Sequence, residues 1–396
     1  MHKTITVILT VLLGLSQQLR AEDWMARLPD DALVATLSIP GAHDACTGCG
    51  WADGMEGLGD LFARTQDIDL AAEWRIGIRA FDLRPCVYEE HMNINHGIMP
   101  TRMHFEDALA LLRDSLAAHP SEFVVIHLLH EADGDQVQGA YNSRLLELLR
   151  RDDLKDLFVD FKTNLTVGEM RGRILLLSRD SYATSPVGGF FLNWTGEANW
   201  DRQRQGRIRG RSTNGRLYMQ DYADTHGTGG LDTKVSAIRQ LLDFSTTHVV
   251  TSTSTITWVF NFASAYSLTQ NLFGNEVSLS DGYRDNAAHT HAAILDYLAT
   301  HDPGPTGVVM MDYVGVDESA GYDVRGQELV DAIIQNNFGY ITTAGVESVD
   351  HSTLNIEHSS LGIEPSYDLL GRRTGNVQFS LFNIQYSTIK TRKRQP

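Results

Sequence analysis

Short apolar runs alternate with amphipathic stretches along most of this sequence. Several runs are continuous and rich in β-branched or aliphatic residues, which is typical of strands covered on both faces. Within residues 105–118, Leu109, Leu112 and Leu116 recur at helical spacing. Strands are therefore predicted at 34–39, 78–83, 123–128, 174–177, 216–219, 249–252 and 308–311, with 339–343 as an eighth candidate, and helices at 105–118, 136–150, 233–244, 286–300 and 326–336.

This alternation predicts the fold class. Strands that alternate with helices imply βα units and a parallel sheet. Seven or eight strands over about 320 residues favour a closed, distorted (β/α)8 barrel of the TIM type over an open sheet.

The two ends of the chain differ from this pattern. Residues 5–15 are an apolar run behind a short, weakly basic start, too short to span a bilayer, so residues 1–21 are predicted to be a signal peptide and the protein to be secreted or extracytoplasmic. An uncleaved anchor is the alternative. The barrel is expected over residues 22–345, and the polar residues 346–396 as a small β appendage or a tail.

Composition narrows the possible partners. Fifty acidic residues against 33 basic ones give a net charge of −17, which disfavours nucleic-acid binding. Cys46 and Cys49 form a C-x-x-C pair, but with only one further cysteine this is a weak zinc signal. We expect one of the two to pair with Cys86 and to leave one thiol free. A monomer is expected.

Polar residues follow the predicted strands directly, at the ends that build the active site of a (β/α) barrel. Two histidines, nearby carboxylates and an arginine can take a proton from one oxygen, protonate another and neutralise a phosphate between them. A structural ion pair between Asp82 and Arg84 is the alternative for those two residues taken alone. The candidates are His43, Asp44, Asp82, Arg84, His96, His130, Glu131, Arg179, Asp221 and Asp312.

Several of these residues lie in short motifs whose order along the chain matches that of a known protein family. The motifs are LSIPGAHDA (37–45), IGIRAFDLR (76–84), NHG (95–97), SEFVVIHLLHE (121–131), MRGRILLLSR (170–179), MQDY (219–222) and GVVMMDY (307–313). Together they resemble the X-domain of bacterial phosphatidylinositol-specific phospholipase C, and the resemblance covers roughly residues 25–340.

The resemblance implies an enzyme that cleaves inositol phospholipids in an intramolecular step. The inositol 2-hydroxyl would attack its own phosphorus, giving diacylglycerol and a cyclic inositol phosphate. His43 would be the general base, held by Asp312, and His96 would protonate the leaving oxygen, supported by Asp44. The tethered nucleophile needs only positioned proton transfer and charge stabilisation.

The remaining roles concern the phosphate and the headgroup. By the same resemblance, Arg84 would stabilise the phosphoryl oxygens, with Asp82 orienting it. Arg179 and Asp221 would contact the inositol hydroxyls, and Tyr222 approximates a stacking aromatic, one residue early. Because a guanidinium stands where calcium-dependent relatives gather carboxylates, no metal cofactor is expected, with calcium as the alternative.

This chain also departs from the bacterial pattern. A lysine follows the third strand there, whereas here Leu129 and then His130 stand in its place. We therefore expect His130 to contribute to headgroup binding, and phosphatidylinositol, a glycosyl-phosphatidylinositol anchor or a related lipid remain open as substrates. His127 and His130 are three residues apart on a strand and face opposite ways, which argues against a zinc site.

Membrane contact is expected from an aromatic stretch. Residues 187–200 include Phe190, Phe191 and Trp194, and five arginines follow within residues 202–211. Exposed aromatics beside a basic patch suit a peripheral contact with a bilayer. A small satellite core with a solvated basic loop is the alternative.

Two other functions compete with the inositol phospholipase. A glycerophosphodiester-type phosphodiesterase could use a similar barrel, although it usually shows a metal set of acidic residues where Asp82 and Arg84 stand here. A barrel that binds inositol lipids or sugars without turnover is the second, and the presence of both histidines and Asp312 argues against it.

Overall fold

The protein is described from a computed structural model, which covers residues 21–183, 185, 187–194, 206–272 and 274–341. Within these residues no helix has both the length and the apolar character needed to cross a membrane. The expected signal peptide, apart from Ala21, and the expected C-terminal appendage or tail lie outside the described residues.

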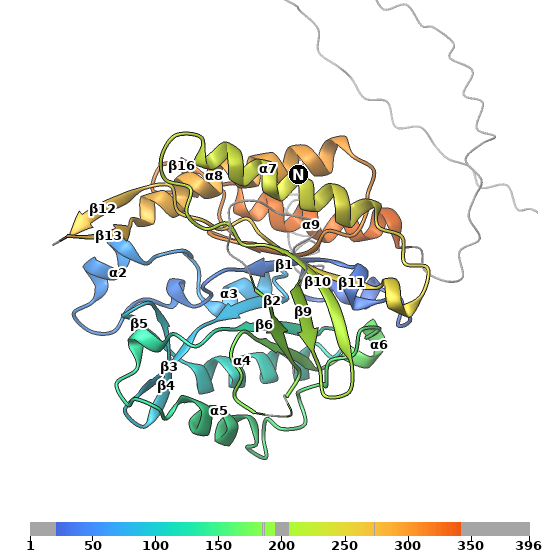
Figure 1. Ribbon diagram of the computed structural model, residues 1–396, viewed down its shortest axis with the longest axis horizontal. Helices are drawn as coiled ribbons and strands as arrows, with labels where there is room; N and C mark the ends of the chain where they lie inside the picture. Colours follow the sequence, from blue (N-terminus) through green and yellow to red (C-terminus); the bar gives the residue numbers. More distant parts are fainter. Residues whose placement is uncertain (1–20, 184, 186, 195–205, 273, 342–396) are drawn as a thin grey trace, which may run out of the picture. The chain divides into compact units, whose positions relative to one another are not determined.

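The core of the fold is a closed barrel of nine strands (Figure 1). Eight of them run parallel, and β9 runs antiparallel between β8 and β10. The distorted (β/α)8 barrel is therefore confirmed, and the distortion is the inserted strand. In order around the barrel the strands are β1 (Ser38–Ala42), β14 (Gly307–Met311), β11 (Thr257–Phe262), β10 (Asn214–Gln220), β9 (Gly206–Arg209), β8 (Gly189–Leu192), β7 (Ile174–Ser178), β6 (Val124–Leu128) and β2 (Ala80–Leu83).

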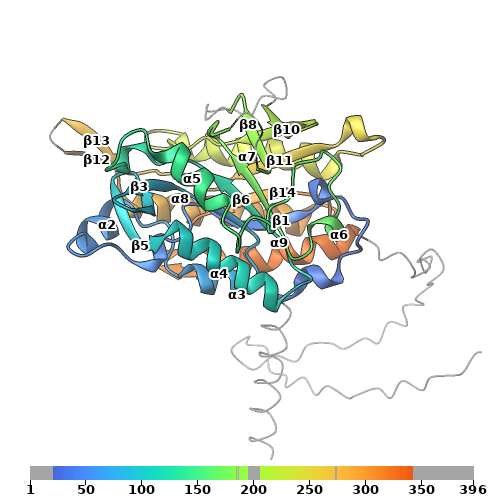
Figure 2. The same ribbon diagram turned by 90° about the horizontal axis from the view of Figure 1, so that it is seen from below.

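Helices and short helical turns pack around the barrel (Figures 1 and 2). The strands β6, β7 and β14 are buried at every residue, because the barrel interior covers one face and helices the other. The helices are α2 (Glu56–Phe62), α3 (Leu70–Arg75), α4 (Phe105–Ala118), α5 (Tyr141–Leu149), α6 (Val167–Met170), α7 (Gly230–Thr247), α8 (Ser280–Thr300) and α9 (Gly326–Tyr340), with 3-10 turns at Trp24–Arg27, Val34–Thr36, Thr47–Cys49, Ala132–Gly134 and Thr253–Thr255.

Among the described residues, three small sheets lie outside the barrel. The first is antiparallel and consists of β3 (Pro85–Tyr88), β4 (His91–His96) and β5 (Met99–His104). The hairpin of β12 (Thr269–Leu272) and β13 (Asn275–Ser278) lies at the same end of the molecule as α2 in both views (Figures 1 and 2). The third is the short pair β15 (Glu318–Ser319) and β16 (Tyr322–Asp323).

Three strand predictions were wrong. Residues 249–252 lie in the connection between α7 and β11, and the barrel strand is Thr257–Phe262. Residues 339–340 end helix α9 rather than starting a strand. The first strand begins at Ser38, because Val34–Thr36 forms a 3-10 turn. In each case a short apolar run gave no information on whether the backbone pairs in a sheet.

Candidate active site

His43 and Asp312 come from neighbouring strands at one mouth of the barrel. His43 follows β1 and Asp312 follows β14, and these two strands pair in parallel. The Nδ1 atom of His43 lies 2.8 Å from Oδ1 of Asp312. The backbone carbonyl of His43 accepts a hydrogen bond from Gln66 Nε2 at 2.8 Å, so both the ring and the main chain of this histidine are fixed.

Arg84 joins His43 to two further carboxylates. Its Nη2 lies 2.8 Å from Nε2 of His43 and 2.8 Å from Oδ2 of Asp82, and its Nε lies 2.7 Å from Oδ1 of Asp44. A guanidinium has only donors, so His43 Nε2 is the acceptor and the ring proton lies on Nδ1, facing Asp312. The structure thus gives His43 the tautomer that a general base requires.

His96 reaches the same cluster from the last residue of β4. Its Nδ1 donates to the backbone carbonyl of Ala63 at 2.7 Å, and its Nε2 lies 3.5 Å from Oδ2 of Asp44. The Nε2 of His43 lies 3.4 Å from that same oxygen. The two imidazoles and the guanidinium, which are far apart in the sequence, therefore converge on Asp44.

The charges of this cluster are set by burial and by Arg84. Burial and Arg84 lower the pKa of His43 well below its ordinary value, and the same two causes lower the pKa of His96. Although burial opposes it, Arg84 and His127 hold the pKa of Asp82 well below its usual range. Burial raises the pKa of Asp44 to about 8, against the opposing effect of Arg84. Asp82 is thus the firmly ionised partner of Arg84, and both imidazoles are neutral near pH 7.

Arg179, Asp221 and Trp194 form a second group at the ends of β7, β10 and β8. Trp194 Nε1 donates to Oδ2 of Asp221 at 2.8 Å, and Arg179 Nη1 lies 3.8 Å from that oxygen. The Arg179 guanidinium also lies 4.7 Å from the centre of the Trp194 ring. Tyr222 is held by its backbone, whose N–H donates to Gln220 and whose carbonyl accepts from the buried Lys234. Two expected headgroup residues are thus together, with an indole between them.

His127 connects the two groups. It is fully buried in β6, and its Nδ1 lies 2.6 Å from Oδ1 of Asp82. Its ring lies under Trp194, at 5.1 Å between centroids, and beside Phe191 and Phe262. From the sequence, His127 was considered only as a zinc ligand, and its contact with Asp82 was not predicted. A single histidine within the apolar run VVIHLL was the available signal, because a buried imidazole needs a polar partner.

His130 lies away from these groups. Its ring stacks on Tyr141 at 3.6 Å, and its Nε2 lies 2.9 Å from Oδ2 of Asp135. The structure therefore does not place its side chain with Arg179 and Asp221. Glu131 is closer to the cluster, with Oε2 at 3.9 Å from Nη1 of Arg84.

The expected membrane contact by Phe190 and Phe191 was wrong. These residues are 1% and 4% exposed, because residues 189–192 form the barrel strand β8. Phe190 packs edge-on against Tyr182, and Phe191 packs against Phe260 and Trp194. Trp194 is half-buried at the mouth, as described above. Buried rings in a barrel wall cannot enter a bilayer.

The expected pairing of Cys86 was also wrong. All three cysteines are free thiols, and Cys86 is buried beside Gly134 and the Asn95 side chain, in the sheet of β3, β4 and β5. Cys46 and Cys49 lie together in the loop after β1.

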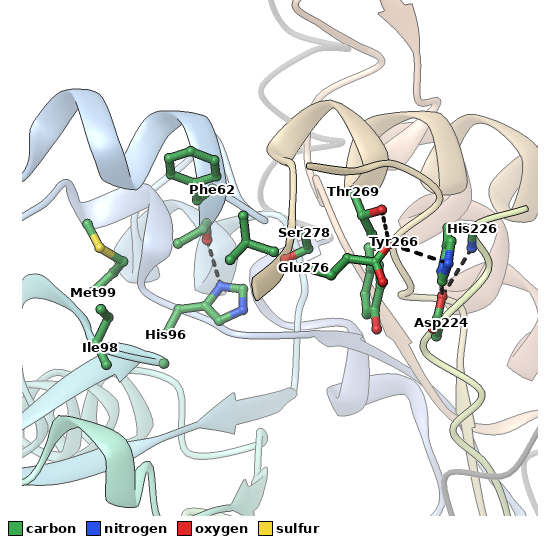
Figure 3. A pocket seen from close by; sticks show the side chains of 13 residues that line it. Phe62, His96, Ile98, Met99, Asp224, His226, Tyr266, Thr269, Glu276 and Ser278 are labelled. Atoms are coloured by element: carbon green, nitrogen blue, oxygen red, sulfur yellow. Dashed lines mark hydrogen bonds and ion pairs between the residues drawn. The ribbon is translucent and has the colours of Figure 1, made fainter. Parts of the chain in front are cut away.

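A groove of about 400 Å³ opens next to His96 (Figure 3). Phe62, Ile98 and Met99 line it around His96, and Tyr266 and Glu276 line its far side. Three large apolar side chains face solvent and are called the apolar rim: Ile98, which lines the groove, is 68% exposed, and Leu58 and Leu61 of α2, the helix that ends with Phe62, are 51% and 50% exposed.

Donor atoms of His43, Asp44 and Asp82 lie close enough together to share a cation. The Arg84 guanidinium already contacts all three side chains. A fixed positive charge at that point makes the addition of a divalent ion unfavourable.

No family model matches the chain, but curated relatives do. The chain is 26% identical over 320 residues to the 1-phosphatidylinositol phosphodiesterase of Staphylococcus aureus (strain Newman), covering 78% of this chain and 94% of that protein. It is 30% identical over 165 residues to the protein of the same name from Listeria monocytogenes, covering 40% of this chain and 49% of that one.

Solved structures show the same fold. A crystal structure of the phosphatidylinositol-specific phospholipase C from Staphylococcus aureus matches 81% of this chain and 99% of that one, with a TM-score of 0.63 and 22% identity. The enzyme of the same name from Listeria monocytogenes matches 80% of this chain and 98% of that one, with a TM-score of 0.56 and 22% identity.

Proposed function

We propose that this chain, a homologue of the bacterial phosphatidylinositol-specific phospholipases C over most of its length, is a phosphodiesterase that cleaves inositol phospholipids. The relatives carry the phosphodiesterase activity in their names, and the motifs of this sequence imply the same reaction. One observation carries the proposal for this chain. Two imidazoles and a guanidinium converge on Asp44 at one mouth of the barrel.

The first step is attack by the inositol 2-hydroxyl on its own phosphorus. The hydroxyl takes the place of Arg84 Nη2 at His43 Nε2, and this nitrogen accepts its proton. Asp312 holds the opposite ring nitrogen and stabilises the imidazolium that forms. Because the nucleophile is tethered to the phosphorus, a positioned base is sufficient to start the reaction.

The second part is departure of the glycerol oxygen. His96 acts in its protonated form: Nδ1–H stays bound to the carbonyl of Ala63, and Nε2 gives its proton to this oxygen as the phosphorus–oxygen bond breaks, so that diacylglycerol leaves neutral and a cyclic inositol phosphate remains. Arg84, released from His43, turns its donors to the phosphoryl oxygens and neutralises the charge that develops there. Asp82 keeps the guanidinium oriented through the 2.8 Å contact.

Arg179 and Asp221 are proposed to bind the inositol hydroxyls. Arg179 has donors and Asp221 has acceptors, and both side chains are part-exposed, at 29% and 17%. The proposal needs no metal ion, because Arg84 supplies the positive charge at the phosphate. We further propose that the protein is secreted, acts as a monomer and touches the bilayer only at its surface.

The apolar rim of the groove is the proposed lipid contact, in place of Phe190 and Phe191. Ile98 lines the groove with His96, where the diacylglycerol oxygen would leave, and Leu58 and Leu61 face solvent on α2, the helix that contributes Phe62 to the groove. Apolar side chains on such a rim can enter the bilayer interface while the charged cluster stays in the barrel mouth.

The proposal is tested with the purified protein and vesicles of phosphatidylinositol in EDTA. We expect release of diacylglycerol and a cyclic phosphate signal in the phosphorus NMR spectrum, and loss of both with His43→Ala. Dependence on added calcium would overturn the metal-independent mechanism. Binding to vesicles without product would identify a lipid-binding barrel, and turnover of deacylated glycerophosphodiesters with no effect on the lipid would favour the other phosphodiesterase class.

A further inference from the structure

Cys46 and Cys49 lie in a tight turn in the loop that follows β1 and His43. Cys46 is the residue before the 3-10 turn Thr47–Cys49, and its carbonyl accepts a hydrogen bond from the backbone N–H of Cys49 at 2.9 Å. The thiol of Cys46 donates a hydrogen bond to the sulfur of Cys49. The two sulfur atoms are therefore neighbours in the folded protein.

The two thiols have unequal environments. Cys46 is fully buried, and burial raises the pKa of its thiol. Cys49 is part-exposed, and its sulfur accepts hydrogen bonds from the Cys46 thiol and from the backbone N–H of Leu70, which together lower its pKa against the effect of burial. A thiol that forms a thiolate readily, beside a second thiol that is sheltered, is the arrangement needed for stepwise disulfide exchange.

A buried carboxyl group stands next to this pair. Glu73 in α3 is fully buried, and neither of its oxygens makes a well-formed hydrogen bond. Burial raises the pKa of Glu73 well above its usual range, the charge of Cys49 raises it further, and the backbone N–H of Cys46 offsets this only in part. Burying a carboxyl group without a hydrogen-bond partner lowers the stability of the folded protein. The position of Glu73 beside two thiols therefore indicates a role for it there.

Cys86 provides the contrast within the same chain. It is buried, no other thiol contributes to its environment, and burial raises its pKa to about 12. Carboxylates also lie near Cys86, since Asp135 and Glu131 raise its pKa further, so what distinguishes it from Cys46 and Cys49 is the lack of a second thiol in its environment.

We propose that Cys46 and Cys49 are a redox-active dithiol that exchanges with small disulfides and dithiols, with Glu73 as the proton acceptor for Cys46. The Cys49 thiolate attacks a sulfur of the small disulfide, forms a mixed disulfide and releases one small thiolate. Glu73 then takes the proton of Cys46, whose sulfur attacks Sγ of Cys49 and releases the second thiolate. The two protons of the protein thiols end on the two small thiols, so the dithiol is oxidised and the small disulfide is reduced.

This site is independent of the phosphodiesterase reaction, although it lies close to it. Cys46 comes two residues after Asp44, and the hydroxyl of Thr47, which lies between Cys46 and Cys49, hydrogen-bonds to Thr65 at 2.8 Å.

The proposal is tested by equilibrating the full-length protein with glutathione buffers of increasing oxidised fraction. After denaturation and alkylation, intact mass reports the number of free thiols. We expect the reduced protein to carry three alkyl groups and the oxidised protein one, with the remaining group on Cys86. Three alkyl groups at every ratio, or a link that includes Cys86, would overturn the proposal.

Matched single variants separate the two thiols. With oxidised glutathione, Cys46→Ser should accumulate a glutathione adduct on Cys49, because the attacking thiolate is present and the second thiol is missing. Cys49→Ser should gain none on Cys46, because that thiol is buried. Equal labelling of the two variants would contradict the assigned order of attack.

Glu73→Gln tests the proton acceptor, since the amide has the same shape and cannot take the proton. We expect closure of the mixed disulfide near pH 7 to slow by about tenfold, so that the adduct persists. An unchanged closure rate in a folded Glu73→Gln protein would remove Glu73 from the proposal. If that variant does not fold, the contrast between the two cysteine variants still decides the dithiol. Zinc bound by the reduced protein, with no disulfide formed, would refute it.

Discussion

The mouth of the barrel has two unlike halves. The charged half lies at the ends of β1, β2 and β14 and holds His43, Asp82, Arg84 and Asp312. Both of its carboxylates, Asp82 and Asp312, are completely buried. The aromatic half, at the ends of β7, β8 and β10, has Arg179 and Asp221 around Trp194, and its polar groups are more exposed.

The difference separates two tasks. In the charged half every side chain is held by at least one partner before substrate arrives, which favours stabilisation of a developing charge without reorganisation. In the aromatic half the contacts are fewer and open to water, which suits the exchange of water for a hydroxylated headgroup. We expect changes in the first half to act on kcat and changes in the second to act on KM.

The largest effect is expected for Arg84 in the charged half. Arg84→Met should lower kcat by about 10³-fold, because several donors at the developing phosphoryl charge are lost. Arg84→Lys should lose about 10²-fold, because an ammonium keeps the charge but not the planar fork. Initial rates on phosphatidylinositol vesicles measure both. Arg239→Met, at an exposed ion pair on α7, is the matched control and should retain full activity.

His127 tests whether the two halves are coupled. His127→Ala removes the partner of a buried, ionised Asp82 oxygen, and we expect kcat to fall by about 10- to 100-fold while KM changes little. His127→Asn keeps a donor and should recover part of the loss. A change confined to KM would instead assign His127 to the aromatic half.

The apolar rim tests which surface meets the bilayer. Replacing Leu58 and Leu61 together by serine should weaken vesicle binding by about thirtyfold, because roughly 1 kcal/mol of apolar burial is lost for each half-exposed leucine. Val249→Ser is the control: this residue is 71% exposed and follows α7, near the amino ends of the strands. Vesicle sedimentation measures the affinities, and equal losses in both proteins would disprove the rim assignment.

Trp194 tests the aromatic half directly. Trp194→Phe keeps a ring near Arg179 but removes the indole donor to Asp221. We expect KM for dispersed short-chain phosphatidylinositol to rise by about fivefold and kcat to stay within a factor of two. A fivefold rise in KM corresponds to the loss of one ordinary hydrogen bond. A fall in kcat alone would mean that Trp194 acts through His127 rather than on the headgroup.

The charged half could be predicted because its residues lie in local motifs at strand ends. In a parallel barrel the carboxyl ends of all strands meet at one mouth, so His43, Arg84 and Asp312 had to be neighbours once the topology was right. The contact of His127 with Asp82 was not predictable in the same way. It depends on the register between β2 and β6, which places these two residues opposite each other.

The membrane contact predicted for Phe190 and Phe191, next to the aromatic half, was wrong for a related reason. GFFL has no alternation, and an apolar run alone does not distinguish an exposed loop from a strand buried on both faces. The inserted strand β9, which turns 189–192 into barrel wall, has the weak pattern GRIR. Cysteine spacing likewise carried no information on pairing, because Cys86 was placed in another sheet by the β3–β5 fold.

The pH dependence gives the smallest expected effect and tests the electrostatics of the charged half. Burial and Arg84 lower the pKa of both His43 and His96 below 6.5. The base His43 becomes protonated only as the pH falls through its lowered pKa, and the acid His96 loses its proton as the pH rises through its own. The maximum of kcat/KM should therefore lie below pH 6.5, with a decline of at least a few-fold by about pH 7. Rates measured across this range check the position, and NMR titration of His43 in Arg84→Met should show its pKa rising. A maximum above about pH 7.5 would mean that the Arg84 guanidinium does not lower the pKa of the two imidazoles in the free enzyme.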